Sequence, residues 1–319
     1  MNEQEVNYMS SLFLGASTLE KRDLINLMPN KIVRKYYIRH DIPKRTGGIR
    51  VIYEPSQTLK TVQRRINRWF LKDAPVSDFA FAYVKGRCIL DNAKPHVGKP
   101  ILLKLDIHHF FDNIHFESVF DIFKSLGFSE NFARLVAGLT TVDDYLPQGA
   151  PTSPALSNLF LKEFDEEIGE YCSKNDIVYT RYSDDLTFSM YRFNPDLVKF
   201  VREKLGALGL ELNRKKSKII CGPLQKRVTG VVVNNKPQVP RSYRHKIRQE
   251  MYYISKYGLD ASLNTRNITD KEKYVSCLLG QINFVLQINK NDDEFKKYRE
   301  ILMTPSLDNL RSQLTNLLN

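Results

Sequence analysis

The residues in this sequence most suggestive of chemistry are two adjacent carboxylates, Asp184 and Asp185, in the run YTRYSDDLTFSM. Tyr, Thr and Phe, which surround the pair, favour strands, whereas Asp is disfavoured in them. Two neighbouring negative charges also repel each other. The pair is therefore either an ordinary turn at the surface or part of a site that binds positive charge.

A third carboxylate, Asp106, follows the short apolar run ILLKL. If this segment pairs with the strands around Asp184, the three carboxylates converge at one edge of a sheet. Magnesium prefers carboxylate oxygens and shares its remaining positions with phosphates and water. Two such ions about 4 Å apart can stabilise the attacking and leaving oxygens of a phosphoryl transfer. The carboxylates therefore predict a site for two Mg²⁺ ions.

The sequence around the carboxylates resembles reverse transcriptases. YSDD resembles their Y-x-D-D box, LKLDIHHFFDNI at 103–114 their first catalytic Asp motif, and LPQGAPTSPALSN at 146–158 their L-P-Q-G loop. IPKRTGGIRVIYEPS and GLELNRKKSKII resemble a fingers motif and a later lysine-containing motif. The motifs occur in the family's order and cover most of the chain. One departure is Ser183, where the family usually has Ala.

Further motifs narrow the resemblance to the bacterial retron reverse transcriptases. NAKPHVG at 92–98 is similar to their N-A-x-x-H motif, and VTGVVVN at 228–234 to their V-T-G motif. The resemblance implies an α+β, right-hand polymerase with fingers, palm and a helical thumb. We expect fingers and palm over residues 1–235 and an RNA-binding thumb over 236–319, with Pro237 and Pro240 marking the boundary.

The resemblance also implies roles for individual residues. Asp106, Asp184 and Asp185, with the backbone carbonyl of Ile107, would hold the two Mg²⁺ ions. The nucleotide-binding residues would be Phe111, which crowds the sugar C2′, Gln148 on the incoming nucleotide, and Arg50, Lys44 and Lys216 near the triphosphate. Phe111 could instead be a core aromatic, since Phe110 precedes it. Gln148 could be mere surface, and other basic residues compete with the three cations.

A second group of residues is predicted to contact RNA: Asn92, His96, Thr229, Gly230, Arg241, Arg244, Lys246 and Arg248. Asn92 and His96 belong to the N-A-x-x-H motif and could instead cap a turn or support the palm. Thr229 and Gly230 could simply form a tight strand. The four cations lie in a helical stretch, with Tyr252 and Tyr253 interleaved further along, that could instead be a solvated amphipathic helix.

Composition agrees with a polymer-binding protein. The 319 residues carry a net charge of +12 and include 16 Tyr and 18 Phe. Such a basic, aromatic-rich chain is a candidate for binding nucleic acid, although the charge alone could serve solubility. The four cysteines are far apart, which argues against a zinc site. We see no signal peptide and no apolar run long enough for a membrane, so a cytoplasmic location is expected.

Local patterns predict the elements that position these residues. Helices are expected at 17–30, 58–72, 116–126, 129–139, 155–172, 195–208, 241–257, 270–288 and 293–316. Strands are expected within 31–56, at 101–107, on both sides of Asp184, and at 216–222 and 227–234.

The resemblance implies RNA-templated addition of deoxynucleotides. Retron enzymes use a cognate noncoding RNA as primer and template, start from an internal 2′-hydroxyl, and leave a branched RNA–DNA product, msDNA. The family also implies antiphage defence with a separate effector protein. Three alternatives remain: an intron-type reverse transcriptase, an RNA-binding scaffold without catalysis, and a polymerase that makes RNA. The absence of maturase and endonuclease extensions argues against the intron-type enzyme. The intact carboxylates argue against the scaffold, and Phe111 argues against the RNA polymerase.

Overall fold

The computed structural model describes residues 1–26, 33–44, 47–265 and 268–303. The chain divides into two compact units: Met1–Cys88 with Pro100–Gly222, and Ile89–Lys99 with Pro223–Asn319. This division differs from the expected boundary after residue 235, because the segment 89–99 packs with residues 227–232 rather than with the sheet. The division into fingers, palm and thumb stays a prediction.

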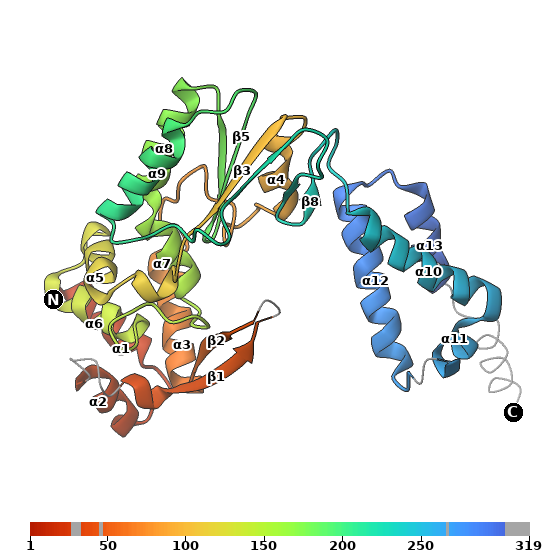
Figure 1. The fold of residues 1–319 in the computed structure, drawn as a ribbon. Coiled ribbons are helices and arrows are strands. Elements are labelled where there is room, and N and C mark those ends of the chain that lie inside the picture. The colour runs from red at the N-terminus through yellow and green to blue at the C-terminus, as the bar shows by residue number, and fades with distance from the viewer. Residues whose placement is uncertain (27–32, 45–46, 266–267, 304–319) are drawn as a thin grey trace, which may run out of the picture. The chain divides into compact units, whose positions relative to one another are not determined.

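A four-stranded antiparallel sheet forms the centre of the first unit (Figure 1). Its order is β4 (Val178–Tyr182), β5 (Asp185–Met190), β3 (Ile101–Asp106) and β6 (Lys218–Cys221). β3 and β5 bury their apolar residues on both sides of the sheet, which explains their nearly continuous hydrophobic sequence. The strands predicted around Asp106 and Asp184 are confirmed.

Five helices of the first unit lie on one side of the sheet and below it in Figure 1: α5 (Phe116–Ser125), α6 (Glu130–Thr140), α7 (Ser153–Phe160), α8 (Lys162–Lys174) and α9 (Asp196–Ala207). Phe123, Phe132, Ile168 and Val201 are fully buried in one hydrophobic core. The single helix expected at 155–172 is wrong. Two helices replace it because Leu161, with φ −92° and ψ 7°, interrupts the helical backbone.

The N-terminal part of this unit carries a long hairpin. α1 (Glu3–Leu12), α2 (Thr18–Asn26) and the 3₁₀ turn η1 (Val33–Tyr36) precede β1 (Tyr37–Pro43) and β2 (Ile49–Pro55). α3 (Gln57–Ile66) follows and continues as the π-helix η2 (Asn67–Leu71). α1 was not predicted, although Asn2 and Glu5 form a capping box at its start. Residues 45–46 of the predicted turn lie outside the described residues.

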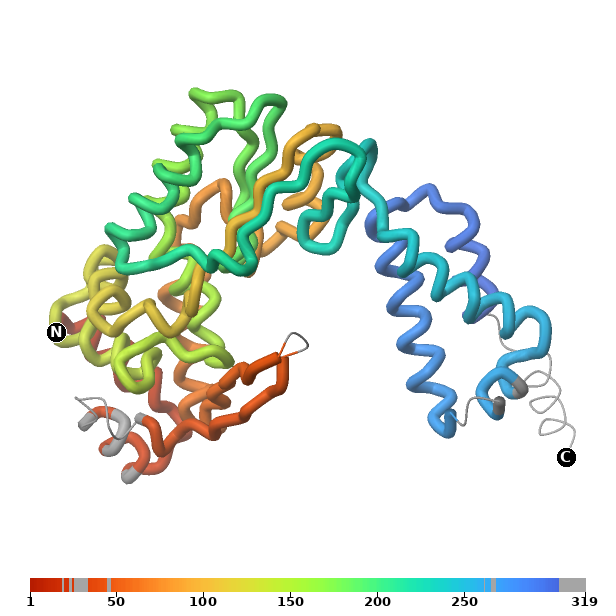
Figure 2. The backbone as a smooth tube through the Cα atoms, in the orientation of Figure 1, coloured from red at the N-terminus to blue at the C-terminus, as the bar shows by residue number. Residues whose placement is uncertain are grey.

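The second unit combines a small hairpin with helices (Figure 2). α4 (Ile89–Ala93), which is followed by the 3₁₀ turn η3 (Lys94–His96), packs on β7 (Arg227–Val228) and β8 (Val231–Val232). The strand expected at 227–234 is therefore a hairpin, because Thr229 and Gly230, with φ of 46° and 86°, form its turn.

The helices of the second unit are α10 (Arg241–Tyr257), α11 (Leu259–Thr265), α12 (Lys271–Ile288) and α13 (Asp293–Met303). The predicted helices at 241–257 and 270–288 are confirmed. The third prediction, 293–316, holds as far as Met303, and its remainder lies outside the described residues. None of the helices that the structure describes has the length and apolar character required to cross a lipid bilayer.

Candidate active site

The pairing of β3 with β5 places Asp106 directly opposite Asp185. Asp184 occupies the β4–β5 turn, where its carbonyl accepts a 3.0 Å hydrogen bond from the backbone N–H of Ile107. Three carboxylates from distant parts of the sequence thus meet at one edge of the sheet. The convergence predicted from the apolar strands is confirmed.

The carboxylate cluster carries more negative charge than its surroundings neutralise. Asp106 is 6% exposed, and its Oδ2 accepts a 2.8 Å hydrogen bond from Nζ of Lys216. Its other oxygen, Oδ1, is buried and has no hydrogen-bond partner among the described residues. Burial, followed by the charges of Asp106 and Asp185, raises the pKa of Asp184 above its usual value.

These features fit a divalent cation bound by oxygen. The described residues contain no group of three or more His, Cys, Asp or Glu side chains already arranged around a metal position. The unpartnered Oδ1 of Asp106 and the raised pKa of Asp184 nevertheless leave carboxylate oxygens that a cation would stabilise. The residues that could hold it are Asp106, Asp184 and Asp185, with the carbonyl of Ile107 as a further oxygen.

A cavity of about 370 Å³ opens beside the carboxylates. Its lining includes Asp106, Ile107 and Asp184 together with every residue predicted to bind the nucleotide, namely Lys44, Arg50, Phe111, Gln148 and Lys216. These residues come from the β1–β2 hairpin, from the segment after β3, from the 146–150 loop and from the segment before β6. The structure therefore brings all five together, although their contacts with a nucleotide remain a prediction.

The two consecutive phenylalanines both line the cavity but are buried to different degrees. Phe110 is 3% exposed and belongs to the hydrophobic core, whereas Phe111 is half-buried and packs against the core from its edge. Phe111 therefore keeps a surface toward the cavity that a sugar could meet. This placement favours Phe111 over Phe110 for the predicted sugar contact.

The glycine of the L-P-Q-G loop is required by its close approach to β2. The carbonyl of Gln148 accepts a 2.8 Å hydrogen bond from the N–H of Tyr53. Gly149 has a φ of 117°, and a Cβ on it would lie 2.7 Å from the carbonyl oxygen of Tyr53. Any side chain here would push the loop away from β2, so Gly149 fixes the position of Gln148 in the cavity wall.

The main feature missed from the sequence is a buried ion pair behind the β4–β5 turn that carries Asp184, hereafter the catalytic turn of the candidate site. The guanidinium of Arg181, fully buried, bonds the carboxylate of Asp165 through Nη2 at 2.6 Å and Nε at 2.8 Å. Its Nη1 donates to Oδ1 of Asn158 at 3.0 Å and to the carbonyl of Ser183 at 3.2 Å. The charge of Arg181 inside an otherwise apolar strand was the available signal.

The N-A-x-x-H and V-T-G motifs contact each other in the second unit. Asn92 and His96 are fully buried, and Nδ2 of Asn92 donates to Oγ1 of Thr229 at 3.4 Å. Thr229 in turn donates to the carbonyl of Ile89 at 3.1 Å. Buried side chains offer RNA no surface, so the placement of Asn92 and His96 contradicts a direct RNA contact and favours the supporting role. Gly230 is exposed.

Two of the four predicted RNA-binding cations are held by acids of the same unit. Arg248 bonds Glu294 through Nε at 2.6 Å and Nη2 at 2.7 Å, and Arg244 pairs with Asp292 and Glu294. Both arginines are therefore paired with acids of the protein itself, and their contact with RNA stays a prediction. Arg241 and Lys246 are exposed.

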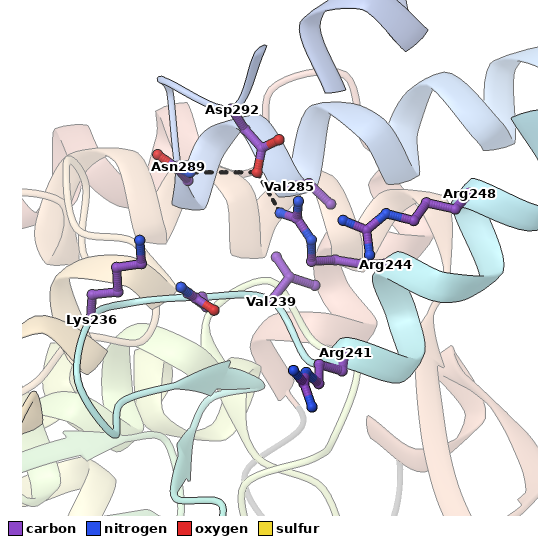
Figure 3. Close-up of a pocket in the computed structure, with 9 residues that line it drawn as sticks. Lys236, Val239, Arg241, Arg244, Arg248, Val285, Asn289 and Asp292 are labelled. Carbon is purple, nitrogen blue, oxygen red and sulfur yellow. Dashed lines mark hydrogen bonds and ion pairs between the residues drawn. The ribbon is translucent and has the colours of Figure 1, made fainter. Parts of the chain in front are cut away.

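A pocket of about 330 Å³ lies at the start of α10 (Figure 3). It is bounded by the segment 236–239 and by α10 together with the end of α12 and Asp292. Arg244 reaches across to Asp292, whereas Lys236 and Arg241 have no ion pair or hydrogen bond within the described part of the chain. This leaves two uncompensated cations on the pocket lining.

The sequence of this polymerase-like site matches a known family. The family model "Reverse transcriptase (RNA-dependent DNA polymerase)" matches residues 42–247, a span that includes all three carboxylates and the cavity residues. The chain therefore belongs to the reverse transcriptase family and has its α+β, right-hand polymerase fold.

Curated relatives narrow the family to bacterial retrons. Retron Mx65 reverse transcriptase of Myxococcus xanthus is 34% identical over 75% of this chain and 60% of that protein. Retron Ec86 reverse transcriptase of Escherichia coli is 35% identical over 65% of each. This chain thus spans about two thirds or less of these relatives' length. Among solved structures, the alignment with apo telomerase from Candida tropicalis covers 90% of this chain and 61% of the telomerase chain. The two are 11% identical in sequence, with a TM-score of 0.47.

Proposed function

We propose that this protein is the RNA-directed DNA polymerase of a retron. The observation that carries the proposal is the meeting of Asp106, Asp184 and Asp185 at one edge of the sheet. The cavity beside this edge is lined by Asp106 and Asp184 together with Lys44, Arg50, Phe111, Gln148 and Lys216. The matches to retron reverse transcriptases support the same activity.

The reaction joins a nucleic-acid hydroxyl to the α-phosphate of a deoxynucleoside triphosphate and releases pyrophosphate. Two Mg²⁺ ions, when bound, would activate the hydroxyl and neutralise the charge that develops on the phosphates. Asp106, Asp184 and Asp185, with the carbonyl of Ile107, are the groups at the sheet edge that would hold them. Because magnesium leaves positions open for phosphate oxygens, these ligands also orient the triphosphate.

The remaining cavity residues bind the incoming nucleotide. Arg50 and Lys44, from the β1–β2 hairpin, neutralise the triphosphate, and Arg presents a planar fork suited to phosphate oxygens. Lys216, from the segment before β6, bonds Asp106 and supplies a further cation to the cavity wall that faces the triphosphate. Phe111 crowds the 2′ position of the sugar, and Gln148 contacts the nucleotide from the loop held against β2.

The second unit serves as the RNA-binding part, with the thumb at 236–319 and fingers and palm before it. The pocket at the start of α10 binds a phosphate of the RNA through Lys236 and Arg241, and Lys246 adds a further cation on the same helix. The contact between Asn92 and Thr229 joins α4 to the β7–β8 hairpin of the same unit and so supports its fold.

The substrate is a structured noncoding RNA that acts as primer and template. The product is branched msDNA, in which the DNA is joined to an internal 2′-hydroxyl of the RNA. The enzyme works in the cytoplasm with a separate effector protein in antiphage defence. The retron relatives and the matching N-A-x-x-H and V-T-G motifs support this part of the proposal.

The test is synthesis of the branched product by purified protein with its upstream RNA, Mg²⁺ and deoxynucleotides. The DNA should remain attached to RNA after RNase H digestion, because a 2′–5′ linkage lies outside the RNA–DNA hybrid. A debranching enzyme should then release it. Asp185→Asn should give no DNA while still binding the RNA.

Different outcomes separate the alternatives. DNA that starts from an ordinary 3′ end and resists debranching would contradict the retron assignment and leave a general reverse transcriptase. RNA binding without any DNA synthesis by the wild-type protein would favour a scaffold. Incorporation of ribonucleotides in preference to deoxynucleotides would favour an RNA polymerase.

A further inference from the structure

Tyr83 borders the cavity next to the carboxylates but belongs to none of the residues assigned above. It is 54% exposed, and its backbone has a φ of 63°. A bulky aromatic residue rarely adopts this left-handed conformation, which is strained for any side chain with a Cβ. Such strain persists where the surroundings fix the backbone, and it concentrates at functional sites.

The chain just before Tyr83 is fixed to the catalytic hairpin. The N–H of Phe81 donates to the carbonyl of Arg181 at 2.8 Å, and the N–H of Arg181 donates to the carbonyl of Phe79 at 2.7 Å. The buried side chain of Asn158 donates from Nδ2 to the carbonyl of Ala82 at 2.8 Å. The segment 79–82 therefore runs along β4 as an added edge.

The chain after Tyr83 returns to close the same loop. Nη1 of Arg87 donates to the carbonyls of Ser77, Asp78 and Ala80 at 3.1, 2.9 and 2.7 Å. A single guanidinium thus ties both ends of the loop together. The loop presents Tyr83 from a fixed backbone rather than from a loose surface turn.

The phenol of Tyr83 is also held in place. Its hydroxyl donates a 3.2 Å hydrogen bond to Oγ of Ser183, which is 7% exposed and directly precedes Asp184. The reverse transcriptase motif usually has alanine at this position, and alanine could not accept this bond. The departure at Ser183 therefore adds a specific link between the Tyr83 loop and the catalytic turn.

We infer that Tyr83 positions the nucleotide that carries the attacking hydroxyl, and that Ser183 orients the ring for this contact. The inference rests on the proposed polymerase function and identifies a contact for its second reactant. The incoming triphosphate is served by the β1–β2 hairpin, Phe111 and Gln148. Tyr83 is anchored instead to β4, α7 and the catalytic turn, and an exposed aromatic ring can pack against the sugar or base of a nucleotide.

The first test removes the hydrogen bond but keeps the ring. Tyr83→Phe and Ser183→Ala should each lower the single-nucleotide extension rate on an annealed primer by about 2- to 10-fold, the effect of one hydrogen bond. The double variant should be no slower than either single variant, because both remove the same bond. Ser125→Ala, which removes a serine hydroxyl at the end of α5, is the matched control and should extend at the wild-type rate.

The second test removes the ring without adding strain. Asn tolerates a positive φ better than Tyr, so Tyr83→Asn should unfold at the same temperature as wild type or higher. It should nevertheless lower the extension rate or the affinity for primer–template by about 10- to 100-fold, which is the size of the rate loss when a reactant is misplaced. The KM for the deoxynucleotide should stay unchanged.

Three results would overturn the inference: no loss in Tyr83→Asn, a rise in the nucleotide KM alone, or additive losses in the double variant. Failure of the proposed function would look different, because the wild-type protein itself would then extend no primer. Primer–template binding measured by fluorescence anisotropy would still report on Tyr83 in that event, with weaker binding by Tyr83→Asn supporting the contact and equal binding refuting it.

Discussion

Lys216 donates a 2.8 Å hydrogen bond to Asp106, so a cation of the chain itself partly compensates the three clustered carboxylates. This bond raises the pKa of Lys216, and its charge opposes the rise in the pKa of Asp184. The compensation is incomplete, since Oδ1 of Asp106 has no partner among the described residues. The remaining repulsion between the carboxylates should therefore destabilise the protein when no divalent cation is bound.

Replacing Asp184 with Asn should stabilise the protein in the absence of divalent cations while abolishing DNA synthesis. The substitution removes one of three mutually repelling carboxylates, and a gain of roughly 1 kcal/mol is expected for a partly buried charge. Thermal unfolding in EDTA measures the gain. Mg²⁺ should raise the unfolding temperature of the wild-type protein more than that of the variant.

Asp121→Asn provides the control for that experiment. Asp121 is an exposed residue of α5 and does not line the cavity, so its loss should change neither polymerisation nor the response to Mg²⁺. Near-normal DNA synthesis by Asp184→Asn or Asp185→Asn would refute the assignment of these residues as metal ligands.

Phe111→Ala should admit ribonucleotides. The half-buried ring borders the cavity, and its removal opens the space in which a 2′-hydroxyl would lie. Single-nucleotide extension with each kind of triphosphate should show discrimination reduced by about 10-fold or more, the effect of one to three kcal/mol of steric exclusion. Unchanged discrimination would place the gate elsewhere, and Phe110→Leu tests the neighbouring ring.

The site was largely predictable because its parts are local patterns. Asp106 ends an apolar strand and Asp184 lies between two others, so pairing of adjacent strands was enough to bring the carboxylates together. The L-P-Q-G loop likewise carries its own reason, since Gly149 must be small to approach Tyr53. In each case the residues that allow the prediction lie within a few positions of one strand or turn.

The partners of buried polar residues could not be predicted in the same way. Asp165 has the sequence context of an ordinary helical acid, and only the packing of α8 on β4 makes it the partner of Arg181. Asn92 and Thr229 are 137 positions apart. Arg248 was expected to face solvent or RNA, because its sequence neighbourhood is basic and Glu294 is 46 positions away.

The buried pair of Arg181 and Asp165 should dominate the stability of the catalytic hairpin. Arg181→Met leaves the buried carboxylate of Asp165 with the hydrogen bond from Tyr179 but without its cation, and a loss of roughly 3–5 kcal/mol is expected. The double variant with Asp165→Leu should recover part of this loss, because no buried charge is left without a partner. Urea unfolding of the variants measures the difference, and equal losses in the single and double variants would contradict the argument.

Stability should depend on pH through Glu294. The hydrogen bond from Arg248 lowers the pKa of Glu294 below its usual 4.5, so the folded state favours the ionised form. The resulting stabilisation is complete above pH 4.5 and disappears as the pH falls through the lower, folded-state pKa. The difference in unfolding temperature between the wild-type protein and Glu294→Gln should therefore be constant near neutrality and shrink below pH 4.5. A difference that persists unchanged in stronger acid would contradict this role.

Salt dependence should distinguish the two kinds of cation around the α10 pocket. Lys236→Gln and Arg241→Gln each remove an uncompensated cation, so each should weaken RNA binding and reduce the slope of log K against log salt by about 0.7–0.9. Arg248→Gln instead removes a partner of Glu294, so it should lower thermal stability and leave the slope nearly unchanged. Binding titrations from low to moderate salt measure the slopes. Slopes equal to that of the wild-type protein in all three variants would mean that the pocket does not bind a phosphate. A slope reduced only in Arg248→Gln would mean that Glu294 releases this arginine when RNA binds.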